Sequence, residues 1–262
     1  MIKLIASDVD GTLIKVGTRV IDRRYYEAIE ALHSLGIAVA IASGRQNDSI
    51  EALFAPVREY TYFISNNGSN IVYNGEMIYQ RELPSEVIKP LCEDLRAITP
   101  DVLITADYGY FFPDISNEFY RFATGYGFGV KAFTSYEDIH GAGKVCVFDK
   151  RIPHPALSLV GKYDIDTFDA GDGWMDFVPK GVSKGGAIGF LQSRLGVGTE
   201  ETATFGDQEN DISMFEVSGF SYGCEGGSAE ALAAASRVIS GPDKHGTLGI
   251  WEKIIESKGE LV

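Results

Sequence analysis

Two carboxylates that follow a short apolar segment are the residues of this sequence best suited to chemistry. Lys3–Ser7 has the length of a buried strand, and Asp8 and Asp10 come after it, one residue apart. Because side chains alternate along an extended chain, both carboxylates would face one side, and Gly11 would then allow a sharp turn. Two like charges this close repel unless a cation lies between them. The pair therefore indicates a site for a hard cation such as Mg²⁺, although Asp-x-Asp-Gly is equally common in plain turns.

Further polar residues follow predicted strands or begin predicted helices. Ser43 and Gly44 come after an apolar run and before a helical pattern, where a hydroxyl and backbone N–H groups can hold a phosphate. Lys184 offers a point charge for phosphoryl oxygens. Asp207 lies between a strand and a helix and could complete a metal site, with Asn210 and Asp211 one turn further on. Each has an ordinary explanation as a cap, a solvated lysine or a turn, but together they fall at one edge of the predicted sheet.

Strand and helix patterns alternate in two parts of the chain, residues 1–82 and 180–262. Continuous apolar runs such as Ile37–Ala42 are typical of strands buried in a parallel sheet, and apolar residues at helical spacing lie between them. The alternation predicts one doubly wound, Rossmann-like α/β core built from both parts. In such sheets ligands bind beyond the carboxyl ends of the strands, which is where Asp8 and Asp207 fall.

Residues 83–179 have a different pattern. Helical segments at Glu86–Ile98 and Asn117–Gly125 are mixed with short strand patterns rich in aromatic residues, among them Lys144–Phe148 and Trp174–Val178. This mixture predicts an α+β cap domain with a small sheet of its own, inserted between the two halves of the core.

Composition and charge narrow the classes of partner. Among 262 residues, 23 are Lys or Arg and 37 are Asp or Glu, a formal net charge of −14, so we expect neither nucleic acid nor a membrane surface as partner. We find no secretory signal pattern and no apolar run of bilayer length. The three cysteines are scattered, as is typical of reduced thiols, and the four histidines lack metal-ligand spacing. We expect a cytoplasmic protein, a monomer or small homo-oligomer.

Four segments together resemble the motifs of the haloacid dehalogenase-like (HAD) phosphohydrolases. They are Asp8–Leu13, Ser43–Arg45, Lys184 and Gly206–Asp211. The large α/β insertion between the second and third segments is most similar to the Cof-type branch of that superfamily. The resemblance covers essentially the whole chain and implies a phosphatase with a Rossmann-like core and a cap.

The resemblance implies a role for each matching residue. Asp8 would be the nucleophile and become an aspartyl phosphate, while Asp10 would protonate the leaving oxygen and then deprotonate the attacking water. Mg²⁺ would be held by Asp8, Asp207 and the backbone carbonyl of Asp10. A carboxylate attacks a phosphate dianion poorly, so a metal and a lysine must offset the repulsion. The transferring phosphoryl group would be held by Ser43 and Lys184, supported by Asn210.

The implied substrate is a small phosphorylated metabolite, with sugar phosphates favoured. Two alternatives stay open: a phosphomutase with the same core and cap, and a non-catalytic phosphate-binding or regulatory protein on the same scaffold. The second alternative predicts the loss of a reacting residue, and Asp8, Asp10, Lys184 and Asp207 are all present. One loop departs from the family, because Gly223–Gly226 reads Gly-Cys-Glu-Gly where members often have Gly-Asn-Ala; we expect that loop to flank the site.

Selectivity among phosphate esters must come from the leaving group, because the phosphoryl-binding residues contact the same group in every substrate. The cap is the element placed to close over that leaving group. We therefore expect its aromatic and polar side chains, rather than Asn67 or Arg45, to rank the substrates. The candidates are Tyr108, Tyr110, Phe111, Tyr120, Arg121 and Trp174.

Overall fold

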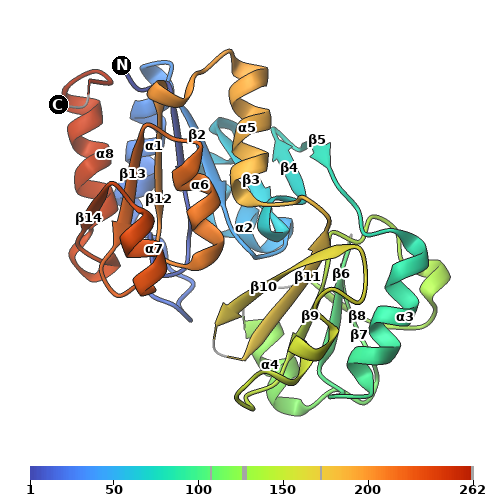
Figure 1. Cartoon of the computed structure of the whole chain (residues 1–262). Helices are drawn as coiled ribbons and strands as arrows, with labels where there is room; N and C mark the ends of the chain where they lie inside the picture. The colour runs from blue at the N-terminus through green and yellow to red at the C-terminus, as the bar shows by residue number, and fades with distance from the viewer. Residues whose placement is uncertain (107, 126–128, 172, 261–262) are drawn as a thin grey trace.

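An eight-stranded sheet is the larger of two sheets in the molecule (Figure 1). The computed structural model describes residues 1–106, 108–125, 129–171 and 173–260. The spatial order is β14-β13-β12-β1-β2-β3-β4-β5, in which the first six strands are parallel and β4 and β5 are antiparallel. The strands are β1 (Leu4–Ser7), β2 (Ala38–Ala42), β3 (Thr61–Ser65), β4 (Asn70–Tyr73), β5 (Glu76–Gln80), β12 (Thr202–Gly206), β13 (Phe220–Cys224) and β14 (Arg237–Ile239).

Helices cover both faces of this sheet, which confirms the predicted doubly wound α/β core. Alternate side chains of β1 serve the two faces: Ile5 belongs to the apolar cluster of α1 and α8, and Leu4 and Ala6 belong to that of α5 and α6. Within the described ranges, no helix has both the length and the apolar character that a bilayer crossing requires. The helices of the core are α1 (Arg23–Ser34), α2 (Asn47–Leu53), α5 (Lys184–Leu195), α6 (Ile212–Glu216), α7 (Ala229–Ala234) and α8 (Gly246–Glu256).

A tight hairpin joins β4 to β5 at the edge of the core sheet. Tyr73 lies opposite Glu76, so Asn74 and Gly75 are the two residues of the turn. Both have positive φ, +51° and +76°, as a type I′ turn requires. The Asn-Gly pair, the strongest short hairpin signal, thus correctly indicates this turn.

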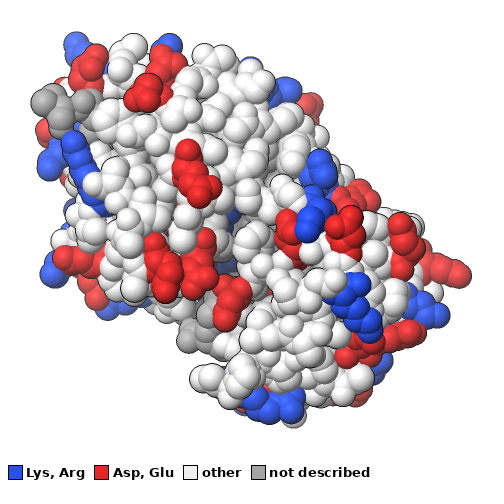
Figure 2. All heavy atoms as spheres, in the orientation of Figure 1, with Lys and Arg blue, Asp and Glu red and all other residues white. Residues whose placement is uncertain are grey.

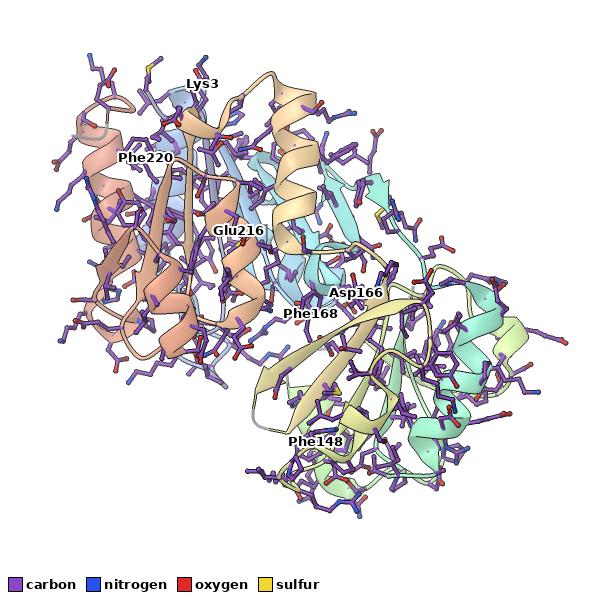
Figure 3. All side chains as sticks on the ribbon, viewed as in Figure 1. Lys3, Phe148, Asp166, Phe168, Glu216 and Phe220 are labelled. Atoms are coloured by element: carbon purple, nitrogen blue, oxygen red, sulfur yellow. The ribbon has the colours of Figure 1, made fainter. Side chains whose placement is uncertain are left out.

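A six-stranded sheet forms the second layered unit, with the order β10-β11-β9-β6-β7-β8. One face packs on α3 through Leu91 and Leu95, and the other packs on α4 through Phe119 and Ala123. Strand β9 begins beside the core with Lys144 and ends far from it at Phe148 (Figure 3). The elements are α3 (Ser85–Arg96), β6 (Val102–Thr105), β7 (Gly109–Phe111), α4 (Asn117–Gly125), β8 (Val130–Ala132), β9 (Lys144–Phe148), β10 (Ile165–Gly171) and β11 (Trp174–Pro179).

The two sheets draw on separate parts of the chain. Strands of the larger sheet come from residues 4–80 and 202–239, and strands of the smaller sheet come from residues 102–179. The connecting segments precede α3 and α5. We therefore propose a core of residues 1–82 and 180–262 and an inserted cap of residues 83–179.

The three cysteines, Cys92, Cys146 and Cys224, are buried free thiols. Burial raises the pKa of each to about 12, which keeps it a neutral, unreactive group. They fill space in the packed interior, as the prediction of reduced thiols requires.

Candidate active site

Polar residues follow neighbouring strands at one edge of the core sheet. Asp8 follows β1, Ser43 follows β2 and Asp207 follows β12, and these strands are parallel neighbours in the order β12-β1-β2. Strands β2 and β3 extend the sheet on one side of β1. After the cap, the chain returns and adds β12 and β13 on the other side of β1. The strand order therefore reverses between β1 and β12, where doubly wound folds form ligand sites. The surface is hollowed where the core meets the cap, with acidic side chains along the edge of the hollow (Figure 2).

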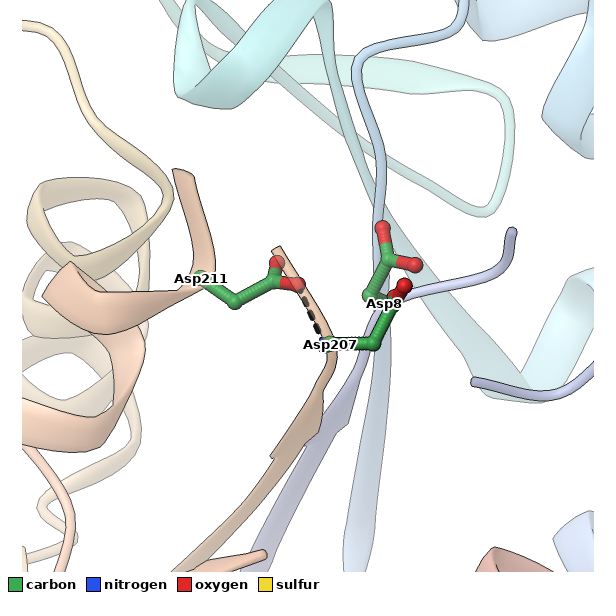
Figure 4. Close-up of side chains that lie close together, drawn as sticks. All are labelled: Asp8, Asp207 and Asp211. Atoms are coloured by element: carbon green, nitrogen blue, oxygen red, sulfur yellow. Dashed lines mark hydrogen bonds between the residues drawn. The ribbon is translucent and has the colours of Figure 1, made fainter. Parts of the chain in front are cut away.

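Three buried carboxylates gather at this reversal point, on Asp8, Asp207 and Asp211 (Figure 4). One oxygen from each lies within 4.8 Å of the others. Burial and the Asp211 carboxylate raise the pKa of Asp207 to about 7, and burial raises the pKa of Asp8 well above its usual range although Lys184 opposes that shift. The ionised form of this cluster is therefore costly unless a cation joins it.

Asp211 is held in place by the turn that follows β12. Its Oδ2 accepts hydrogen bonds from the backbone N–H groups of Asp207 at 2.8 Å and Gln208 at 3.0 Å. The carboxylate of Asp207 accepts one hydrogen bond from Thr12 and one from Gln208, each 3.0 Å long. A carboxylate oxygen has two lone-pair sites, so Asp207 keeps capacity for a metal ion.

Lys184 lies inside the carboxylate cluster. Its Nζ donates to Oδ1 of Asp8 and to Oδ1 of Asp211, both at 2.6 Å, and the side chain is 1% exposed. Burial disfavours the ammonium, but the charges of Asp211 and Asp8 outweigh it and hold the pKa of Lys184 above its usual range. Ser183 caps the helix that starts here by accepting from Gly186 N–H at 3.0 Å. Lys184 is therefore a fixed positive charge beside Asp8.

The carboxylate of Asp10 points to a different partner. Arg45 donates to both of its oxygens, from Nε at 2.7 Å and from Nη2 at 2.6 Å. The chain does not stay extended after Asp8, because the N–H groups of Leu13 and Ile14 fold back onto the carbonyl of Val9. Asp10 is therefore not one of the three carboxylates that lie together, and its place at a metal stays a prediction. Asp211 takes the third place in the carboxylate cluster.

Gly11 forms the tight part of this turn. Its φ is +89°, and a Cβ at this position would lie 2.2 Å from Oδ2 of Asp207. Only glycine fits both constraints. Gly11 thus permits the turn and also allows the loop after β1 to approach the carboxylate of Asp207.

Ser43 and Gly44 form a loop between β2 and α2. Ser43 is fixed by the sheet, since its N–H donates to Ile64 O and its carbonyl accepts from Asn67 N–H. The helix begins only at Asn47, so the two residues precede it by three or four positions and do not form its N-terminus. The backbone N–H of Arg45 bonds to the Ser43 hydroxyl at 3.2 Å. This loop, rather than a helix terminus, supplies the polar groups.

Asn210 reaches the same loop region through Asn67. Asn210 Nδ2 donates to Asn67 Oδ1 at 3.0 Å, and Asn67 has a left-handed φ of +59°. Asn67 Nδ2 in turn donates to Oδ2 of Asp176, a cap residue, at 2.7 Å. Asp176 also accepts from Lys144, whose Nζ donates to Gly44 O at 2.9 Å. A continuous polar chain therefore joins the cap to the loops of the core.

Comparison with known proteins decides the family. The profile of the haloacid dehalogenase-like hydrolases matches residues 5–250. The chain belongs to this family. The 5-amino-6-(5-phospho-D-ribitylamino)uracil phosphatase of Escherichia coli is 27% identical over 267 residues, which cover 97% of each chain. An HMP-PP phosphatase from Enterobacter is 25% identical over 222 residues, covering 82% of this chain and 80% of that one.

Solved structures support the same assignment. A haloacid dehalogenase-like hydrolase from Bacteroides thetaiotaomicron has a TM-score of 0.85 and 25% identity, covering 97% of this chain and 100% of that one. A protein from Thermotoga maritima has a TM-score of 0.80 and 26% identity, covering 97% and 98% of the two chains. The chain is thus a HAD-like phosphatase of the Cof type, and the resemblance seen in its motifs is confirmed.

Two residues of this hydrolase's site were not singled out by sequence reasoning: Lys144 and Asp176. The sequence placed Asp211 one turn after Asp207 without giving it a role, although the four-residue spacing puts a second carboxylate on the same side. Lys144 opens an apolar strand pattern and Asp176 interrupts another. A charge inside a buried strand needs a partner, and that rule could have pointed to both.

The loop that departs from the family pattern lies beside Asp207. Ser228 N–H donates to the carbonyl of Asp207 at 2.8 Å, and a Cβ on Gly227 would lie 2.2 Å from that carbonyl. Glu225 and Gly226 line a cavity of about 380 Å³ that also reaches Asp207. The loop thus flanks the carboxylate cluster, as its sequence position suggested.

The predicted selectivity residues of the cap fall into two groups. Tyr110 is buried in the cap, and Trp174 packs against Phe119 at 5.2 Å between ring centroids. Tyr108 and Tyr120 are 39% and 42% exposed. Packing accounts for Tyr110 and Trp174, and contact of the exposed tyrosines with a leaving group stays a prediction. The remaining candidates are Phe111, which is half-buried, and Arg121, which is exposed.

Proposed function

We propose that this hydrolase is a Mg²⁺-dependent phosphatase of small phosphorylated metabolites that works through an aspartyl phosphate on Asp8. The observation that carries the proposal is the position of the Asp8 carboxylate, between the Lys184 ammonium and the Asp207 carboxylate. Two relatives support the substrate class by name: the Escherichia coli phosphatase acts on a phosphorylated ribityl compound and the Enterobacter phosphatase acts on HMP-PP. We favour sugar phosphates, as for the phosphorylated ribityl chain of the first relative.

The charge balance of the site fits a divalent cation. Among the described residues, the site outlined above contains five carboxylates and three cations, a formal excess of two negative charges. Asp8 and Asp207 have oxygens left for a metal, and Mg²⁺ characteristically takes one or two carboxylates and keeps water or phosphate oxygens. We propose these two side chains and the backbone carbonyl of Asp10 as protein ligands. The carboxylates are Asp8, Asp10, Asp176, Asp207 and Asp211, and the cations are Arg45, Lys144 and Lys184.

Phosphoryl transfer to Asp8 follows from these charges. A bound Mg²⁺ would supply positive charge that offsets the repulsion between a carboxylate and a phosphate. An oxygen of Asp8 forms a bond to phosphorus while the bond from phosphorus to the ester oxygen breaks, and Asp10 gives that oxygen its proton. Asp10 then takes a proton from water, which attacks the acyl phosphate and releases inorganic phosphate with Asp8 restored. Both oxygens of Asp10 accept hydrogen bonds from Arg45 in the structure, so Asp10 must exchange one of these bonds to take part in proton transfer.

The phosphoryl oxygens need donors that stay in place during the reaction. Lys184 is fixed beside Asp8, and Ser43 and Gly44 lie on the neighbouring strand end. Asn210 has a second amide N–H besides the one that donates to Asn67. We propose that these four residues bind the transferring group, because preorganised donors stabilise charge that develops in the transition state.

Release of inorganic phosphate from p-nitrophenyl phosphate, with and without Mg²⁺, tests the proposal. We expect turnover that depends on Mg²⁺ in the wild type and none in Asp8→Asn, followed by selection of sugar phosphates from a panel of esters. A phosphomutase would instead return an isomeric phosphate ester with little free phosphate. Absence of turnover with every ester, together with tight phosphate binding, would favour the non-catalytic alternative and overturn the proposal.

A further inference from the structure

A buried ion pair of the cap extends into the phosphate-binding loops of the core. Lys144 Nζ and Asp176 Oδ2 are 2.8 Å apart, and their side chains are 6% and 3% exposed. The two residues lie on neighbouring antiparallel strands, Lys144 at the start of β9 and Asp176 within β11. Nothing in the motif pattern of the family segments involves either residue, so the pair calls for a separate explanation.

The partners of this pair lie in the core. Lys144 donates to the carbonyl of Gly44 at 2.9 Å, and Asp176 accepts from Asn67 at 2.7 Å. Asn67 then accepts from Asn210 at 3.0 Å. A Cβ on Gly44 would lie 3.0 Å from the Asn67 amide oxygen, so the two core loops are already in close contact. The pair therefore contacts the Gly44 loop directly and reaches Asn210 through Asn67, and both Gly44 and Asn210 are residues that we propose to hold the phosphoryl group.

Stability alone is a weak reason for such a pair. Removing two charges from water costs free energy that their attraction rarely exceeds, and apolar replacements of buried pairs are often neutral or stabilising. The base of the cap has other attachments to the core: Ser69 Oγ donates to Gly143 O at 2.8 Å, and Thr105 Oγ1 donates to Asn66 Oδ1 at 3.3 Å. The cap does not depend on the ion pair for its connection.

We propose that Lys144 and Asp176 are positioning residues of the phosphatase, supplied by the cap to set the geometry of the phosphate site. This inference rests on the proposed function. Lys144 fixes the carbonyl of Gly44 and so orients the backbone of that loop toward the phosphoryl group. Asp176 fixes the Asn67 amide, which orients Asn210. Because both side chains are engaged with the core loops that face the phosphoryl group, we expect the pair to act equally on every phosphate ester.

The test separates positioning from stability. We expect Asp176→Asn and Lys144→Met each to lower kcat/KM about 10–100-fold, by the same factor on p-nitrophenyl phosphate and on the best sugar phosphate, since small misplacements are costly. The double variant Lys144→Met with Asp176→Leu removes both charges, so we expect its Tm to return toward the wild-type value while kcat/KM stays low. Lys150→Met is the matched control, because Lys150 and Glu118 form an ion pair on the cap surface with exposures of 66% and 65%.

Each outcome decides between the alternatives. Recovery of kcat/KM together with Tm in the double variant would overturn the proposal, because the pair would then be structural. If the double variant does not fold, Asp176→Asn decides: wild-type kcat/KM overturns the proposal, and a uniform loss at near-native Tm supports it. A loss confined to one substrate would also overturn it. Wild-type protein without any turnover would contradict the proposed function itself, whereas active wild type with unaffected variants contradicts only the role of the pair.

Discussion

The core and the cap each bury one lysine near the reaction centre, and the two lysines have different surroundings. Lys184 of the core lies between Asp8 and Asp211, inside a cluster in which carboxylates are in excess. Lys144 of the cap has one carboxylate partner, Asp176, and a neutral carbonyl. An excess of buried negative charge raises the free energy of the folded protein until a cation binds. Such a cluster is therefore suited to a metal-dependent reaction. The Lys144–Asp176 pair carries no net charge, so it is suited to fixing the position of the core loops that it contacts.

The largest loss of activity should come from a substitution in the carboxylate cluster. Asp8→Asn removes the attacking charge and keeps the shape of the side chain, so we expect kcat to fall by at least about 10⁴-fold with the fold intact. Near wild-type activity in this variant would exclude Asp8 as the nucleophile. Circular dichroism of both proteins checks that folding is unchanged.

Asp10 should have a smaller but still large effect. Asp10→Asn keeps one acceptor for Arg45 and loses proton transfer, which typically contributes about 10²–10⁴-fold to kcat. The loss should shrink for esters with good leaving groups such as p-nitrophenyl phosphate, because those need little protonation. An equal loss for good and poor leaving groups would contradict the acid role of Asp10.

The effect of Mg²⁺ on the Tm should reveal the excess negative charge of the carboxylate cluster. The pKa of Asp207, about 7 in the fold, is raised above its value in an unfolded chain. The folded protein therefore binds a proton that the unfolded chain releases, and metal-free stability falls as pH rises between about 4 and 7. Mg²⁺ displaces that proton, so the Mg²⁺-induced rise in Tm should be larger at pH about 8 than at pH about 5. A hundredfold excess of metal over Kd should add about 2.7 kcal/mol at the higher pH.

An equal rise in Tm at both pH values would argue against carboxylate ligands in this cluster. Asp207→Asn provides the control, because it removes one of the two ligands with a raised pKa and should reduce the pH dependence of the metal effect. Activity should disappear in excess EDTA and return with Mg²⁺, and Ca²⁺ should restore it poorly because it accepts longer, less regular oxygen contacts.

The smallest effect, and the most selective, should come from exposed tyrosines of the cap. Tyr108→Ala should lower kcat/KM on the best sugar phosphate about tenfold, the value of one good contact, and leave p-nitrophenyl phosphate nearly unchanged. This outcome would contrast with the uniform loss expected for the ion pair of the cap. If Tyr108→Ala and Tyr120→Ala lower kcat/KM by the same factor on all substrates, selectivity is determined by the core loops near Asn67 and Cys224.

The sequence supported the fold and much of the site because both depend on local pattern. Parallel strands end at one sheet edge, so Asp8, Ser43 and Asp207 could be placed together from apolar runs alone. The turn was expected at Gly11 but begins earlier, because alternation assumes a chain that stays extended through Asp10 and the backbone folds back onto Val9. The contact between the cap's ion pair and the core could not be predicted for another reason: Lys144 donates to Gly44, 100 positions away, and no local pattern encodes that contact.

Trapping of the phosphorylated enzyme tests the central claim most directly. Protein mixed with substrate and Mg²⁺ is quenched in acid during turnover, digested, and analysed by mass spectrometry. We expect one phosphoryl group on the peptide that contains Asp8 in the wild type, and none in Asp8→Asn. Phosphate release at full rate with no phosphoryl group on Asp8, or with one on another residue, would contradict the covalent mechanism.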